Sequence, residues 1–250
     1  MQGCDRMNPF WRNFMKAPGG VRRTGLARWF QILEERFMTL FWANLLCLAW
    51  ALPLLAALFF FLQTWDWLSG VGVVLGTAVL GPGVTALNRV CMQIIRDKPV
   101  SVAQEFFASV KRDWKQSALF ALIIGALWGM FAWAVRLVGL TEGGFNPVLA
   151  VGFFLSAFVM MGLTVIGFQQ IAMVALPFRG VLKNGFLLIL AGGGRAAGAI
   201  LFSLAAAAVC LRFYEYCVWY LILGAPALLV MTANLIFYPV FEQYFPEEDA

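Results

Sequence analysis

Three stretches of this chain are long, apolar and almost free of charged side chains. Asp66 is the only charged residue between positions 37 and 83, and none occurs in residues 143–178 or 216–241. An α-helix rises about 1.5 Å per residue, so about 20 apolar residues cross the hydrocarbon core of a bilayer, which is about 30 Å thick. With 62% hydrophobic and 12% charged residues, the chain has too little polar surface for a water-soluble fold. We therefore predict one integral membrane domain, an all-α polytopic transmembrane helix bundle.

The hydropathy pattern predicts about six spans within a transmembrane domain of residues 38–240. They are expected at residues 38–62, 68–87, 117–135, 148–176, 196–211 and 216–240. The fifth span is short. In the alternative reading it begins in the apolar residues 186–191, and Gly192, Gly193 and Gly194 form a break inside it.

The distribution of lysine and arginine predicts the orientation. Sixteen of the 18 basic residues lie in the N-terminal arm, residues 1–37, and in the connections after the second and fourth spans; Arg136 and Arg212 are the exceptions. Basic residues near span ends are retained on the cytoplasmic side. We therefore expect the basic arm, which does not resemble a cleavable signal, and the acidic tail, residues 241–250, in the cytoplasm. Orientation and anionic lipid account for the net charge of +5, so no nucleic acid partner is expected.

Two cytoplasmic segments, residues 24–37 and 101–116, are predicted to form amphipathic helices. In both segments apolar and polar residues fall on opposite faces at helical spacing, which is typical of helices at a bilayer interface. The second segment offers a surface at which a partner protein could dock. Its apolar stripe includes Phe106, Phe107, Val110 and Trp114.

The ionisable residues argue against catalysis. The chain has no histidine, the commonest general base and metal ligand. Its five cysteines form no Cys-x-x-Cys pair, and none of the 13 acidic residues lies in the middle of a span, where pumps and transporters usually carry ionisable groups. We expect no enzymatic activity, no cofactor and no metal site, and we expect membrane lipid as a partner.

Uncharged polar side chains inside the spans have two interpretations. Most such groups form hydrogen bonds between helices, typically worth about 0.6 kcal/mol. Alternatively, Gln169, Gln170 and Asn234 line a polar path for a solute. The second interpretation requires that these three side chains converge in the fold.

Glycine and proline mark places where helices approach or break. GxxxG motifs at residues 72–76 and 125–129 predict close contacts between helices. The cluster Gly81, Pro82 and Gly83, near the cytoplasmic end of the second span, predicts either a packing kink or a helix interruption of the re-entrant type.

Several short motifs resemble the YesL-type family of bacterial membrane proteins. They are Gly-Pro-Gly-Val-Thr-Ala-Leu at residues 81–87, Phe-Phe at 106–107 and Lys-Arg-Asp-Trp-Lys-Gln at 111–116. Met-Asn-Pro-Phe at residues 7–10 and Asn-Leu-Leu at 44–46 are also similar, so the likeness covers mainly residues 1–125. The molecular function of this family is unknown, and its members often accompany carbohydrate uptake transporters. The resemblance implies an association with sugar import, and it supplies no catalytic residues.

Two functional hypotheses follow from these observations. The first is a noncatalytic accessory membrane protein that assists carbohydrate uptake by contacting the permease subunits of an ABC-type transporter. The second is a small-solute transporter or channel in its own right. The sequence makes no prediction of oligomeric state.

Overall fold

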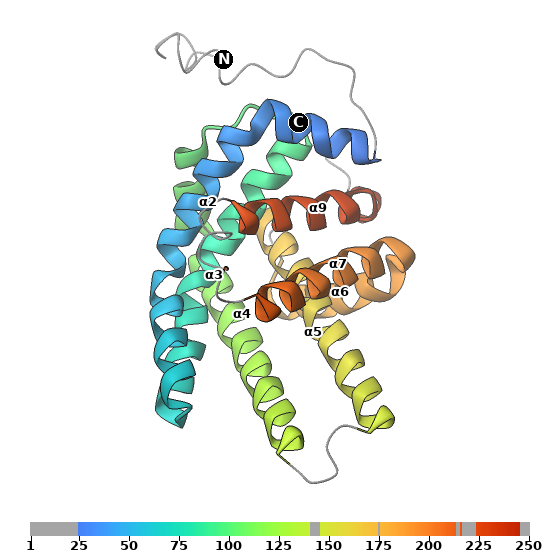
Figure 1. Ribbon diagram of the computed structural model, residues 1–250. Coiled ribbons are helices and arrows are strands. Elements are labelled where there is room, and N and C mark those ends of the chain that lie inside the picture. Colours follow the sequence, from blue (N-terminus) through green and yellow to red (C-terminus); the bar gives the residue numbers. More distant parts are fainter. Residues whose placement is uncertain (1–24, 141–145, 175, 214–215, 217–223, 246–250) are drawn as a thin grey trace.

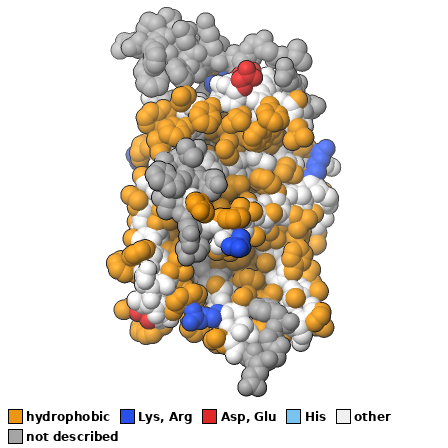
Figure 2. All heavy atoms as spheres, in the orientation of Figure 1, with side chains coloured by type: hydrophobic (Ala, Val, Ile, Leu, Met, Phe, Trp, Pro, Cys, Tyr) orange, Lys and Arg blue, Asp and Glu red, His pale blue; other side chains and the backbone are white. Residues whose placement is uncertain are grey.

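The computed structural model describes residues 25–140, 146–174, 176–213, 216 and 224–245. Within them the chain forms seven helices: α2 (Gly25–Thr64), α3 (Trp67–Ile95), α4 (Val102–Gly139), α5 (Pro147–Met173), α6 (Phe178–Ala191), α7 (Gly193–Arg212) and α9 (Ala225–Tyr244). Six of them, all except the 14-residue α6, are long and apolar enough to cross a membrane. These helices confirm an all-α, multi-pass membrane bundle. Hydrophobic side chains cover most of the face seen in Figure 2, as a lipid environment requires.

Two helices are longer than predicted, because each amphipathic segment continues into the following span. α2 has 40 residues and α4 has 38, which correspond to about 60 Å and 57 Å of helix, nearly twice the thickness of a hydrocarbon core. Neither glycine nor proline separates the amphipathic part of either helix from its apolar part. No signal therefore ends the helix at that point. Of the predicted N-terminal arm, residues 1–24 lie outside the described residues.

The first turns of α2 lie across one end of the bundle (Figure 1). Arg28 forms an ion pair with Asp97, just beyond the end of α3, at 2.6 Å. Further along α2, Trp50 packs against Gly83, where a Cβ would lie 2.8 Å from the Trp50 Cβ. Between these two contacts α2 advances by 22 residues, whereas the chain on the α3 side advances by only 14. The amphipathic part of α2 therefore covers the end of α3 instead of running alongside it.

Helices α2, α3 and α4 pack closely, because glycines on one helix face the backbone or side chains of the next. A Cβ added at Gly76 of α3 would lie 2.7 Å from the Leu54 Cα of α2. A Cβ added at Gly125 of α4 would overlap the Thr77 side chain of α3. Both glycines belong to the GxxxG motifs, so the predicted helix contacts are confirmed.

The predicted interruption at Gly81, Pro82 and Gly83 is wrong. α3 is one continuous helix with Pro82 inside it, and all three residues are buried. A Cβ at Gly81 would overlap the Ser117 carbonyl oxygen and lie 2.6 Å from the Ala121 Cβ of α4. The cluster therefore brings α3 close to α4 on one side and to α2 on the other.

The fifth span corresponds to α7 (Gly193–Arg212), near the first predicted bounds, and residues 186–191 belong to a separate helix instead of to the same span. An apolar helix, α6, precedes α7, and the chain turns at Gly192 and Gly193. Gly193 has a φ of +51°, a conformation that glycine adopts without steric cost. The two helices form a hairpin in which Ile189 and Ile200 both approach Gly162 of α5.

The last helix, α9, lies across the bundle instead of along it (Figure 1). The Ala227 N–H near its start donates to Asn44 Oδ1 of α2 at 3.3 Å, and the Trp29 indole donates to Thr232 Oγ1 at 2.9 Å. Both partners lie in the first half of α2, near the end that the amphipathic segment covers. α9 begins at Ala225, after Gly224 with a φ of +109°. Of the predicted sixth span, residues 217–223 lie outside the described residues, and the first residues of the predicted acidic tail belong to α9.

Candidate functional site

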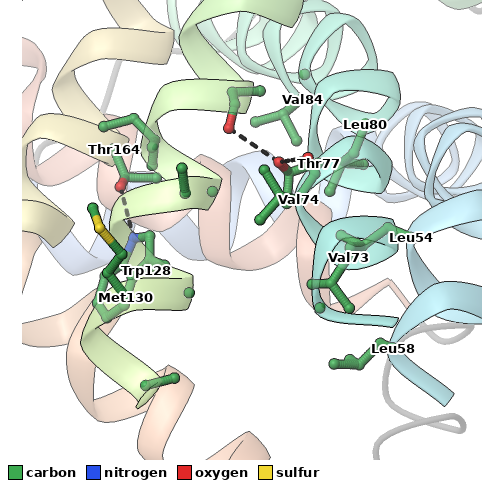
Figure 3. Close-up of a pocket in the computed structure, with 18 of the residues that line it drawn as sticks. Leu54, Leu58, Val73, Val74, Thr77, Leu80, Val84, Trp128, Met130 and Thr164 are labelled. Carbon is green, nitrogen blue, oxygen red and sulfur yellow. Dashed lines mark hydrogen bonds between the residues drawn. The ribbon is translucent and has the colours of Figure 1, made fainter. Parts of the chain in front are cut away.

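A cavity of about 1090 Å³ lies among six helices, between the α2–α3–α4 unit, α5 and the crossing helices α7 and α9. Figure 3 shows apolar side chains of α2 and α3 on one side of it, with Trp128 and Met130 of α4 and Thr164 of α5 on the other. The walls include Leu54 and Leu58 from α2, Val73, Val74, Leu80 and Val84 from α3, and Met130 from α4. Ser203 and Ala206 of α7 and Ala233 and Asn234 of α9 complete the lining. The volume is slightly above the range of about 300–1,000 Å³ that small-molecule sites occupy.

Most polar groups on the cavity wall are already bonded within the protein. The hydroxyls of Thr77, Thr164 and Ser203 each donate to a backbone carbonyl in the preceding turn of the same helix, at 2.6–2.8 Å. The Trp128 indole donates to the Thr164 hydroxyl at 3.2 Å, and the Asn88 amide donates to the Val84 carbonyl at 2.9 Å. The wall therefore offers an apolar surface even where its residues are polar.

Asn234 is the exception at the inner end of the cavity. Its side chain is 1% exposed, and its Oδ1 accepts a hydrogen bond from Nε2 of the fully buried Gln169 on α5. The structure thus brings together two of the three residues predicted to line a polar path. Gln170 does not join them, because its amide faces α6, where a Cβ at Gly185 would lie 3.5 Å from Nε2. Among the described residues, neither Asn234 Nδ2, Gln169 Oε1 nor the Gln170 amide has a hydrogen-bond partner.

The exposure of the lining residues shows where the cavity opens. Asn234 and Asn88 are 1% and 4% exposed, whereas Trp67 at the start of α3 is 77% exposed and Leu137 near the end of α4 is 51% exposed. Asp66, which also lies at this open end, accepts a hydrogen bond from the Ser69 N–H at 2.7 Å. Hydrogen bonds from Ser69 lower the pKa of the Asp66 carboxyl. The cavity is therefore open beside the α2–α3 turn and closed beneath α9.

A layer of charged and aromatic side chains closes the opposite end of the bundle. Arg28 is buried, and its guanidinium contacts Gln31 Oε1 at 3.1 Å and the Ile95 carbonyl at 3.2 Å in addition to Asp97. Arg96 lies 6.0 Å from the centre of the Tyr238 ring of α9. Sequence reasoning assigned these arginines to the topology alone, and it missed the contacts that they make with neighbouring helices. Arg28 lies on the polar face of the predicted helix, and the structure buries this face against the bundle while Leu26 and Phe30 on the apolar face are 80% and 62% exposed.

Two arginines from this layer bind the end of α5. Arg89 of α3 and Arg112 of α4 each donate to the Ala172 carbonyl at 3.2 Å, and Gln116 donates to the Leu176 carbonyl at 2.8 Å. Carbonyl groups in the last turn of a helix have no partner within the helix, and the helix dipole favours cations there. The basic residues of α3 and α4 therefore fix the end of α5, and with it Gln169.

The four residues predicted to dock a partner do not share one surface. Phe106 is fully buried in the core, so it is not available to a partner. Phe107 and Trp114 are 54% and 53% exposed. Val110 and Trp114 line a groove of about 500 Å³, called here the α4 groove, together with Lys111 and with residues of α2 and α3. The remaining lining residues are Trp50, Ala78, Val79, Pro82 and Ala118. The sequence pattern predicted a single apolar face that is available to a partner. In the structure, α4 packs the part of this face that carries Phe106 against the rest of the bundle.

The described residues contain no group of three or more histidine, cysteine, aspartate or glutamate side chains placed to hold a metal ion. Cys47 and Cys91 are buried in the core as free thiols. Cys91 Sγ makes a long hydrogen bond of 3.9 Å to the Ala227 carbonyl.

No curated protein and no solved structure matches this chain. One family model does match, over residues 37–135, and its description is "Protein of unknown function, DUF624". The matched segment covers all of α3 and most of α2 and α4, including the α4 groove. The closely packed α2–α3–α4 unit is thus similar to DUF624, the family that includes the YesL-like proteins.

Proposed function

We propose that this chain is a noncatalytic accessory membrane protein that supports carbohydrate uptake by binding a permease subunit of an ABC-type transporter. The α4 groove, with the adjacent Phe107, is the proposed contact surface. The link to carbohydrate uptake rests on the likeness to the YesL-type family, and the contact surface rests on the structure.

The exposure of Phe107 and Trp114 beside a groove is the observation that carries this proposal. Large aromatic side chains that stand next to a preformed groove are the usual anchors of protein–protein interfaces, whereas charged rim residues contribute less. Trp114 also lies 5.7 Å from the Lys115 ammonium, which leaves the opposite side of the indole for a partner. An amphipathic or transmembrane helix of the permease fits a groove of this kind.

Site-specific photo-crosslinking in intact cells tests the proposal. A photoreactive phenylalanine analogue at position 114 is expected to crosslink to a permease subunit of a carbohydrate transporter. The same analogue at position 154, whose native Phe154 is 54% exposed on α5, is the matched control. Identical crosslinked products at both positions, or products that contain lipid alone, would contradict the proposal.

Copurification supplies a quantitative version of this test. The double substitution Phe107→Ala and Trp114→Ala should reduce the recovered permease by about tenfold, the effect of removing interface anchors. Phe154→Ala should leave the recovery unchanged. Equal recovery from all variants would show that this surface is not the contact.

One observation favours the second candidate, a small-solute transporter. The cavity reaches the buried Asn234, which is hydrogen-bonded to Gln169, so a polar group of a solute could meet a hydrogen-bonding side chain deep in the bundle. Purified protein in liposomes should then move a sugar or related solute, and Asn234→Leu should abolish the flux. Flux equal to that of empty liposomes across a broad panel of solutes would exclude this candidate.

A further inference from the structure

We propose that the large cavity binds a single-chain amphiphile from the membrane, such as a long-chain fatty acid or alcohol. Its uncharged oxygen end group would accept a hydrogen bond from Asn234 Nδ2, and its chain would extend along α3 and α4 toward the opening. This inference goes beyond the accessory role and does not depend on it.

The chemistry of the wall argues for an apolar chain. The threonine and serine hydroxyls, the Trp128 indole and the Asn88 amide on the wall each donate a hydrogen bond to a carbonyl or hydroxyl oxygen of the protein. A water-filled cavity of this size would leave that apolar surface hydrated, at a free-energy cost that an acyl chain removes.

The buried amide argues for an oxygen at one end of the ligand. Asn234 Nδ2 is a donor without a partner among the described residues, in a side chain that lines the cavity and is 1% exposed. An unpaired buried donor is unfavourable, and a ligand oxygen would satisfy it. The oxygen of a hydroxyl or of a protonated carboxyl, which can accept this hydrogen bond without carrying a charge, therefore suits Asn234.

The dimensions and the charges argue for a single chain with an uncharged end. On α3 the lining residues run from Trp67 to Asn88, a rise of about 32 Å for 21 residues, so a long chain fits lengthwise. No lysine or arginine lines the cavity in the described part of the chain; Asp66, at the open end, is the only charged lining residue. A phosphate head group would therefore lack a cation at the inner end.

A photoactivatable palmitic acid tests this site directly. The probe carries a diazirine on its chain and is added to the full chain in nanodiscs of phosphatidylcholine. Crosslinks are expected on the lining segments of α3, α4 and α7, and they should saturate and be displaced by unlabelled palmitic acid or hexadecanol. Hexadecane, which lacks the oxygen, should require an about fivefold higher concentration, the effect of one neutral hydrogen bond.

Two variants separate the contributions of the chain and of the anchor. Ala206→Phe fills the cavity from α7 and should abolish saturable labelling, whereas Ala208→Phe, at an exposed position on the same helix, should not. Asn234→Leu should weaken palmitic acid binding by about fivefold and leave hexadecane unaffected. Nonsaturable labelling spread over the lipid-facing helices, or labelling that Ala206→Phe does not change, would overturn the proposal. Equal potency of hexadecane and palmitic acid would overturn the role of Asn234.

Discussion

Gly81 occupies the tightest point between α3 and α4, where its missing side chain leaves room for the backbone of α4. A methyl group there would overlap the Ser117 carbonyl oxygen and approach the Ala121 Cβ. Backbone atoms cannot move aside as the end of a flexible side chain can, so the two helices would have to separate. Inserting a methyl group into such a contact typically costs about 1–3 kcal/mol.

Gly81→Ala should therefore lower the thermal unfolding temperature of the detergent-solubilised protein. The expected change is about 2–4 °C for each kcal/mol lost in a chain of this size. Gly152→Ala is the control, because nothing lies within 4 Å of a Cβ at that position in α5. An unfolding temperature for Gly81→Ala equal to that of the control would show that α3 and α4 do not pack as described.

Asn234 and Gln169 show what sequence reasoning can and cannot find at the scale of residues. Both were predicted as candidates because uncharged polar side chains in apolar spans are uncommon and need partners. Their pairing depends on α9 crossing α5, which no local pattern reveals. Phe106 shows the opposite case, since helical spacing places it on the same stripe as Trp114, yet tertiary packing buries only Phe106.

Among the helices, α5 depends on its neighbours for a stable end. Its last turn leaves carbonyl groups without partners, and Arg89 and Arg112 reach the Ala172 carbonyl from two different helices. A cation near a helix C-terminus is typically worth about 0.3–1 kcal/mol. The two arginines therefore couple the order of this turn to the packing of α3 and α4.

Replacing both arginines by methionine should loosen the end of α5. Hydrogen exchange at the amides of the last turn, up to Met173, should become faster in the double variant Arg89→Met and Arg112→Met. The double variant Lys111→Met and Lys115→Met, which removes the same two positive charges at exposed neighbouring sites, should leave the exchange rate unaltered. Unchanged exchange in the arginine double variant would mean that these hydrogen bonds do not stabilise the turn.

The helices themselves were largely predictable from the sequence, but the places where they begin and end and their directions in the bundle were not. Uncharged apolar runs identified all six long helices, because each span in lipid must satisfy its backbone hydrogen bonds internally. The turn at Gly192 and Gly193 was also visible as a glycine run. The fusion of interfacial segments with spans in α2 and α4 was missed, since amphipathicity describes how residues divide between two faces and says nothing of where a helix ends. The crosswise course of α9 was missed because hydropathy indicates the length of a helix and not its direction.

At the scale of the whole molecule, the two ends of the bundle have opposite characters. One end is closed by α9, by the amphipathic part of α2 and by arginines that bond across helices. The other is open, beside the α2–α3 turn, and leads into the apolar cavity. If the basic end is cytoplasmic, as the positive-inside rule predicts, the cavity opens away from the cytoplasm and the α4 groove lies toward it. The proposed partner contact depends on this orientation, whereas the proposed amphiphile site does not.

Cysteine accessibility in intact cells measures that orientation directly. In a variant without the native cysteines, single cysteines replace Ala108, an exposed residue of the amphipathic part of α4, and Leu140, which is 73% exposed at the far end of the same helix. A membrane-impermeant maleimide should label Leu140→Cys in intact cells, and it should label Ala108→Cys only after the membrane is permeabilised. Labelling of Ala108→Cys in intact cells, with Leu140→Cys protected until permeabilisation, would contradict the account.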